Sequence, residues 1–266
     1  MIRVGLKSLS FLISFLFLLS SCDFSSELHQ DILFAQKSAR DKNYSESIAL
    51  YEEILKKNPP LAIREKIYFR LGELYSLYAG NPRKGIKYFE ELRKETEDPG
   101  WLVKVEERIG DIRFTQLKDY VGAIENYEKL VGFSPKLEKN DFYEFRLASS
   151  FLESRKFERA IDTFSKINQN QHHEYNSDSV YYIGLCYFQK NDFERTLKIW
   201  GDFVTKGKSK ERIVEVKFLM GTIYETQEKY DLAYEFYYSI LGDYPNPEVV
   251  KDRIKSLHLR RLQRKR

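Results

Sequence analysis

Residues 183–200 read IGLCYFQKNDFERTLKIW, and this stretch decides the fold. Its small residue Gly184 is followed twelve positions later by a second small residue, Thr196, and four positions after that by Trp200. The same arrangement begins at five other small residues, Ala35, Gly72, Gly110, Ala148 and Gly221, and with Gly184 included the six starting points lie 36 to 38 positions apart. A constant period of this length is typical of stacked repeats, so we divide the chain into six units.

Each unit carries two helical patterns. The second small position is occupied by Ser47, Gly85, Ala123, Ala160, Thr196 and Ala233. The aromatic four residues later is Tyr51, Phe89, Tyr127, Phe164, Trp200 or Tyr237. An apolar residue follows three positions further on, which is helical spacing, and units two and three have one extra residue at the turn. We expect antiparallel helical hairpins that approach at the small residues and bury their rings by stacking.

The units resemble the tetratricopeptide repeat, whose first helix pairs a small residue with an aromatic and whose second helix carries alanine, an aromatic and proline. The first-helix aromatic is supplied by Tyr75, Phe151, Tyr187 and Tyr224. Ser38 and Arg113 occupy its place in units one and three. The resemblance covers residues 28–245 and implies an all-α solenoid, and an irregular helical bundle is the alternative.

The expected domain organisation follows from these boundaries. The six hairpins are expected at 28–61, 65–98, 103–136, 141–173, 177–210 and 214–246. Before them come a signal peptide at 1–21 and a short tether at 22–27, and after them a basic capping helix at 247–266. Repeat arrays need such a cap because the last hairpin otherwise exposes its apolar face.

The N-terminus has the layout of a secretory signal. Arg3 and Lys7 precede an apolar run over residues 9–19, which is too short for a membrane-spanning helix. The sequence Leu19-Ser20-Ser21-Cys22 resembles the bacterial lipobox, which implies cleavage before Cys22 and attachment of acyl chains such as palmitate to it. An ordinary signal peptide with a chance cysteine is the alternative. We therefore expect a lipoprotein anchored in the bacterial cell envelope, with the choice of inner or outer membrane left open.

Motifs for catalysis or metal binding do not emerge from the sequence. Neither a Gly-rich phosphate loop nor a His and Cys constellation is present. His172 and His173 are expected in a polar surface loop, and Cys186 as a buried small residue within a helix. We expect no enzymatic activity, no cofactor and no metal.

A partner-binding groove is expected on the first helices, as in the family that the units resemble. The groove positions are Phe69, Phe142, Phe145, Tyr181, Leu185, Phe188 and Phe218. Those in units four and five form an apolar patch, whereas units two and three offer charged residues such as Lys66 and Glu73. Packing of the same rings between helices is the alternative.

Charge is unevenly distributed. Residues 22–266 hold 42 Lys and Arg against 40 Asp and Glu, but residues 251–266 hold eight basic residues against one acidic. This tail is open to three interpretations: a soluble cap, a partner contact, or a contact with anionic lipid. Nucleic acid is not expected as a partner, because the chain is expected to be exported and its other helices are net acidic.

The function expected from these features is an envelope scaffold that binds proteins. A narrower hypothesis is similarity to the repeat lipoprotein of the outer-membrane β-barrel assembly machinery (BamD-type), which combines a lipobox with the same repeat. An envelope protein that acts on the cell wall or binds small ligands is a third hypothesis. The sequence does not predict the oligomeric state.

Overall fold

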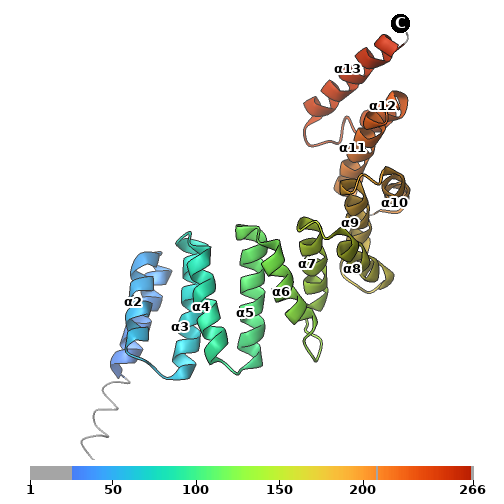
Figure 1. The fold of residues 1–266 in the computed structure, drawn as a ribbon. Helices are drawn as coiled ribbons and strands as arrows, with labels where there is room; N and C mark the ends of the chain where they lie inside the picture. The colour runs from blue at the N-terminus through green and yellow to red at the C-terminus, as the bar shows by residue number, and fades with distance from the viewer. Residues whose placement is uncertain (1–25, 208, 265–266) are drawn as a thin grey trace, which may run out of the picture. The chain divides into compact units, whose positions relative to one another are not determined.

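The computed structural model describes residues 26–207 and 209–264, and every regular element in these ranges is helical (Figure 1). The signal peptide and Cys22 lie outside the described residues. Within the described ranges, no helix combines the length and apolarity needed to span a bilayer. The predicted all-α solenoid class is confirmed.

The chain divides into two compact units, residues 1–118 and 119–266. The first unit begins with a helix over residues 26–40. It continues with α2 (Tyr44–Lys56), α3 (Leu61–Glu73), α4 (Pro82–Glu95) and α5 (Pro99–Ile112). Two π-helical segments, η1 (Leu74–Tyr78) and η2 (Arg113–Leu117), directly extend α3 and α5. Within this unit α4 packs on both α3 and α5.

The second compact unit contains the second helix of hairpin three, the whole of hairpins four to six, and the terminal helix. Its elements are α6 (Tyr120–Val131), α7 (Asn140–Glu153), α8 (Phe157–Gln169), α9 (Asn176–Gln189), α10 (Phe193–Lys206), α11 (Lys210–Thr226), α12 (Tyr230–Tyr238) and α13 (Pro247–Arg264). Each of these helices packs on the next in chain order. This is the contact pattern expected for a repeat array.

The second helix of every hairpin begins at the same place in the repeat, three residues before the second small residue. These first residues are Tyr44, Pro82, Tyr120, Phe157, Phe193 and Tyr230. Pro82 suits a helix start because its missing N–H has no partner to lose there. Before three of these helices, the side chains of Asn81, Asp119 and Asp192 accept hydrogen bonds from backbone amides of the first turn.

The turn inside each hairpin is equally regular. One residue of each turn has a positive φ, and it always comes five positions before the second small residue. In the six hairpins this residue is Lys42, Gly80, Lys118, Arg155, Asn191 and Glu228. A residue of positive φ after a helix lets backbone amides cap its last carbonyls. Only glycine and asparagine favour this conformation, so four of the six turns rely on packing of the helices to hold it.

The extra residue of units two and three is absorbed in the first helix. In repeat units two and three the first helix ends in η1 and η2 respectively, where each backbone hydrogen bond spans one residue more than in an α-helix. The second helix can then begin in the same register as in the other units. The extra residue that the sequence predicts at the turn therefore lies at the end of the helix that precedes the turn.

Close approach of the two helices depends on the small residues. A Cβ placed on Gly184 would lie 2.1 Å from Trp200 Nε1, and one on Gly72 would lie 2.6 Å from the Phe89 ring. The Trp200 indole N–H donates to the Tyr181 carbonyl at 3.1 Å, so the ring cannot simply move away. The ring of the second helix therefore fills the space that a side chain on the first helix would occupy.

We predict that Gly184→Ala lowers the free energy of unfolding by about 2 kcal/mol, because the added methyl group overpacks the contact with Trp200. Gly201→Ala is the matched control, since Gly201 lies inside α10 with no atom within 4 Å of an added Cβ. There alanine should raise helix stability by about 0.5–1 kcal/mol. Urea denaturation measures both, and equal effects of the two substitutions would contradict the packing account.

Candidate binding surface and polar clusters

The seven predicted groove residues are all partly or fully buried. Phe69 lies on α3 in the first unit, and the other six lie on α7, α9 and α11 in the second unit. Phe69 contacts Phe89 and Trp101, with ring centroids 5.4 and 5.3 Å apart. Phe218 stacks on Tyr244 at 4.6 Å. Packing between helices thus uses part of each ring, and their role as a partner contact stays a prediction.

Phe145 belongs to an aromatic cluster that joins hairpins four and five. Its ring stacks on Tyr175 at 4.4 Å and meets Phe164 and Tyr182 edge-on at 5.8 and 5.2 Å. Tyr182 in turn stacks on Phe164 at 5.1 Å. These offset and edge-on geometries stabilise a cluster beyond the area that it buries. Phe142 lies one turn earlier on α7, with the Arg146 guanidinium 5.1 Å from its ring.

Tyr181 is the most buried of the predicted residues, with 4% of its surface exposed. Its hydroxyl donates to Glu215 Oε1 at 2.8 Å, and the Arg212 guanidinium lies 4.4 Å from its ring. Burial and the neighbouring Glu215 carboxylate both raise its pKa. Leu185 and Phe188 follow it on the same face of α9 and are only partly buried. Both also pack against the core cluster that contains Trp200, so the predicted residues of α9 offer a partner only the exposed part of this pair.

A pocket of about 680 Å³ lies where α9, α11 and the loop before α13 meet, and we name it the α9–α11 pocket. It is lined by Asp178, Ser209, Glu211, Arg212, Val214, Glu215, Asp243, Tyr244, Pro245 and Asn246. The sequence prediction missed these carboxylates. Helical spacing could have found two of them, because Asp178 and Glu215 each come three residues before a predicted groove aromatic and so lie on the same helix face.

The groove-facing helices of the first unit offer a different surface. A pocket of about 380 Å³ lies between the helix over 26–40 and α3. His29, Gln36, Lys66 and Arg70 contribute polar groups to its lining. Lys66, one of the predicted charged groove residues, lies in this lining, and the charged character of the groove in repeat units two and three stays a prediction.

His173 occupies an unexpected place. The prediction of a surface loop is right for His172, which is exposed, and wrong for His173, which is buried. The ring of His173 turns inward because its Nδ1 accepts the Tyr175 amide at 3.1 Å. Its Nε2 lies 3.2 Å from Glu144 Oε2 and 3.8 Å from Asp141 Oδ1.

Asp141, Glu144 and His173 are residue types that can bind a metal ion, and one possible ligand atom from each lies within 4.8 Å of the others. Nδ1 accepts the Tyr175 amide, so Nε2 is the ring nitrogen that faces the two carboxylates. Nε2 is buried and makes no hydrogen bond within the described residues. Glu144 is also held by Asn140 Nδ2 at 2.6 Å and by Lys136 Nζ at 3.4 Å. The backbone amide of Glu174 donates to Asp141 Oδ2 at 3.0 Å, and this bond fixes the loop on α7.

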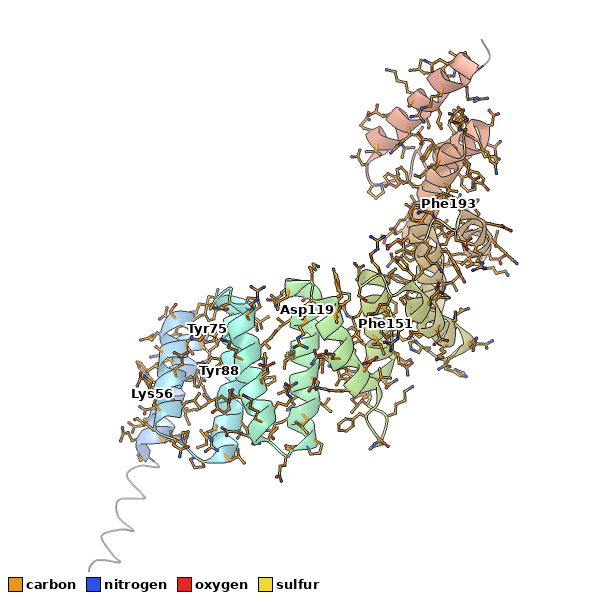
Figure 2. All side chains as sticks on the ribbon, in the orientation of Figure 1. Lys56, Tyr75, Tyr88, Asp119, Phe151 and Phe193 are labelled. Atoms are coloured by element: carbon orange, nitrogen blue, oxygen red, sulfur yellow. The ribbon has the colours of Figure 1, made fainter. Side chains whose placement is uncertain are left out.

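A second polar cluster joins the first two hairpins. The Glu52 carboxylate accepts hydrogen bonds from the hydroxyls of Tyr75 and Tyr88, both at 2.7 Å, and from Lys84 Nζ at 3.0 Å. The two tyrosine rings stack with their centroids 5.5 Å apart, on neighbouring helices (Figure 2). Burial raises the pKa of Glu52, but the hydrogen bonds from Tyr88, Tyr75 and Lys84 outweigh it and hold the pKa below its ordinary value of 4.5.

The basic tail forms a cap. In α13, Val250 and Leu257 are fully buried against the last hairpin. Arg253 and Arg260 both pair with the buried carboxylate of Glu225, at 3.3 and 3.1 Å. The ion pairs support the capping interpretation of the tail, and the interpretations as partner contact and lipid contact stay predictions.

Cys186 is a buried free thiol on α9. Burial raises its pKa to about 12, so the thiol stays protonated at neutral pH. A protonated thiol is a poor nucleophile, and Cys186 acts as a small core residue.

We predict that Glu52→Gln lowers the free energy of unfolding by about 1–2 kcal/mol at pH 7, because charge-assisted hydrogen bonds are lost at a partly exposed site. The folded-state pKa of Glu52 is depressed, so its contribution is present above the unfolded pKa and is lost as pH falls through the folded value. The difference from wild type should therefore shrink below pH 4.5. Glu53→Gln, on the exposed neighbour, is the control, and a difference that does not change with pH would refute the assignment.

Solved structures that are similar to this chain include the following three. The apo form of RapI aligns with TM-score 0.55 and 15% identity over 79% of this chain and 62% of RapI. Naa15/Naa10 bound to HypK-THB aligns with TM-score 0.53 and 16% identity over 87% of this chain, which spans only 39% of that protein. PilW, a type IV pilus biogenesis factor, aligns with TM-score 0.52 and 12% identity over 86% of this chain and 97% of PilW. No family model and no curated protein sequence matches.

Identities at this level show the fold alone. The helical hairpins, their small-to-aromatic contacts and these structural likenesses agree on one architecture. The chain has the fold of an all-α solenoid of the tetratricopeptide type.

Proposed function

We propose that this chain is a non-enzymatic scaffold that holds partner proteins in the bacterial cell envelope, anchored by lipid on Cys22. The observation that carries the binding role is the face of α7 and α9, where Phe142, Leu185 and Phe188 keep part of their apolar surface exposed. Neighbouring apolar side chains that stay partly exposed can mark a protein interaction site. Repeat folds present such faces as extended binding surfaces.

One structural likeness supports a binding role. Naa15/Naa10 is described as bound to HypK-THB, so a chain with a similar fold holds protein partners in that case. The two polar clusters fit a non-enzymatic role, because Glu52 and Glu144 accept hydrogen bonds from Tyr75, Tyr88 and Asn140 within the fold.

The anchor is supported by the sequence before the first hairpin. The signal layout and the lipobox resemblance place the mature N-terminus at Cys22, and the first helix begins by residue 26. Leu28 is already buried in the first core cluster. With so few residues between them, two or three acyl chains on Cys22 hold the first hairpin close to the bilayer.

We predict that Leu185→Lys abolishes partner binding while the protein stays folded. A lysine at a partly buried position of the proposed surface removes an apolar contact and introduces a charge that the partner must desolvate. Leu232→Lys is the control, because Leu232 is 39% exposed on α12, a second helix. The partner is captured by crosslinking in cells and mass spectrometry, at matched amounts of folded protein. Equal capture by both variants would rule out this face as the contact.

We further predict that Cys22→Ser abolishes acylation. Cells fed an alkyne analogue of palmitate should label the wild-type chain and Cys186→Ser but not Cys22→Ser, because Cys186 is buried in the folded protein. Membrane fractionation of the same samples tests the anchor. Labelling of Cys22→Ser at the wild-type level would refute lipidation at this position.

A further inference from the structure

The α9–α11 pocket continues the proposed binding face. On α9, Asp178 comes three residues before Tyr181 and seven before Leu185, and this spacing places the three on one side of a helix. On α11, Glu215 likewise comes three residues before Phe218, on the same side of the helix. A partner segment that lies along Leu185 therefore reaches the pocket at the beginning of the two helices.

Negative charge dominates the lining of the pocket. Four carboxylates face one guanidinium, that of Arg212, which is engaged by Glu215 at 3.4 Å and by the Tyr182 hydroxyl at 3.2 Å. Asp243 pairs with Lys210, whose side chain is 76% exposed. Neither Asp178 nor Glu211 has an ion-pair partner within residues 26–207 and 209–264. The described lining is thus short of positive charge.

Arg212 lines the pocket and is itself held by a carboxylate of the lining and by two rings outside it. Its guanidinium pairs with Glu215 and lies 4.4 Å from the centroid of Tyr181 and 5.4 Å from that of Tyr182. Glu215 is thereby engaged, and Asp178 and Glu211 are the lining carboxylates left for a guanidinium or ammonium group of a partner. Tyr244 and Val214 add apolar surface for the aliphatic stem of such a side chain. At about 680 Å³, the volume lies within the range of ligand pockets.

We propose that the α9–α11 pocket binds a lysine or arginine side chain of an extended partner segment whose apolar residues contact Leu185 and Phe188. This assignment rests on the proposed scaffold function and adds the chemistry of the partner to it. Charge complementarity is the argument for the occupant, since uncompensated carboxylates raise the local concentration of cationic groups and reject acidic segments.

The test uses the full chain in detergent and fluorescence anisotropy. The probe is a fluorescein-labelled nonapeptide with arginine at every third position in a serine and alanine background, and its twin has glutamine in place of arginine. Asp178→Asn with Glu211→Gln should weaken binding of the arginine peptide about 5- to 10-fold and leave the twin unchanged. Glu53→Gln with Glu91→Gln is the control, because it removes the same charge from exposed positions on α2 and α4.

Several results would overturn the proposal. Equal affinity of the wild-type chain for both peptides would show that the pocket does not select cations. Tighter peptide binding after replacement of Arg264, Lys265 and Arg266 by glutamine would assign the pocket to the chain's own tail. Loss of a dimer in Asp178→Asn with Glu211→Gln, seen by sedimentation, would assign it to a second copy.

The cellular crosslinking experiment separates this inference from the scaffold function. If Asp178→Asn with Glu211→Gln retains the partner and Leu185→Lys loses it, the scaffold stands and the pocket assignment fails. If the wild-type chain holds no partner at all, the scaffold function itself fails.

Discussion

The backbone of Gly184 lies against the indole of Trp200, and equivalent contacts bring Gly72 against Phe89 and Gly221 against Tyr237. In each case the ring occupies the volume that a side chain on the first helix would fill, so the identity of one small residue decides how closely two helices approach. A ring held between two backbones stabilises the hairpin and also presents the face on which the next hairpin packs. The regular turns and helix starts are consequences of this contact, because each must deliver the second helix in the same register.

The same constraint explains what the sequence could predict. The period, the hairpins and the class of fold followed from small residues and aromatics, whose spacing is dictated by backbone contact. The π-helical ends of α3 and α5 did not, because one extra residue can be placed in a loop or in a helix with the same spacing overall. The left-handed turn residues were equally hidden, since Lys42 and Glu228 have side chains with no preference for positive φ.

Functional surfaces were predicted less well than the fold. Register predicts which aromatics face a groove, and that role stays a prediction, whereas their mutual packing, as of Phe145 on Tyr175, depends on tertiary contacts that spacing does not reveal. His173 was missed as a buried group because the hydrogen bond that turns it inward is local to its loop. The carboxylates of the α9–α11 pocket resemble ordinary solvated helix residues in sequence, and only the fold gathers Asp178, Glu215 and Asp243 around one cavity.

The central claim is that partners lie along the first-helix face of the second unit. Site-specific photocrosslinking in cells tests it most directly, with a photoreactive amino acid placed at Leu185 or at Leu232 of the full-length chain. The account predicts a discrete crosslinked protein from position 185 and none from position 232, which lies on a second helix. The same crosslinked protein from both positions, or from position 232 alone, would contradict it.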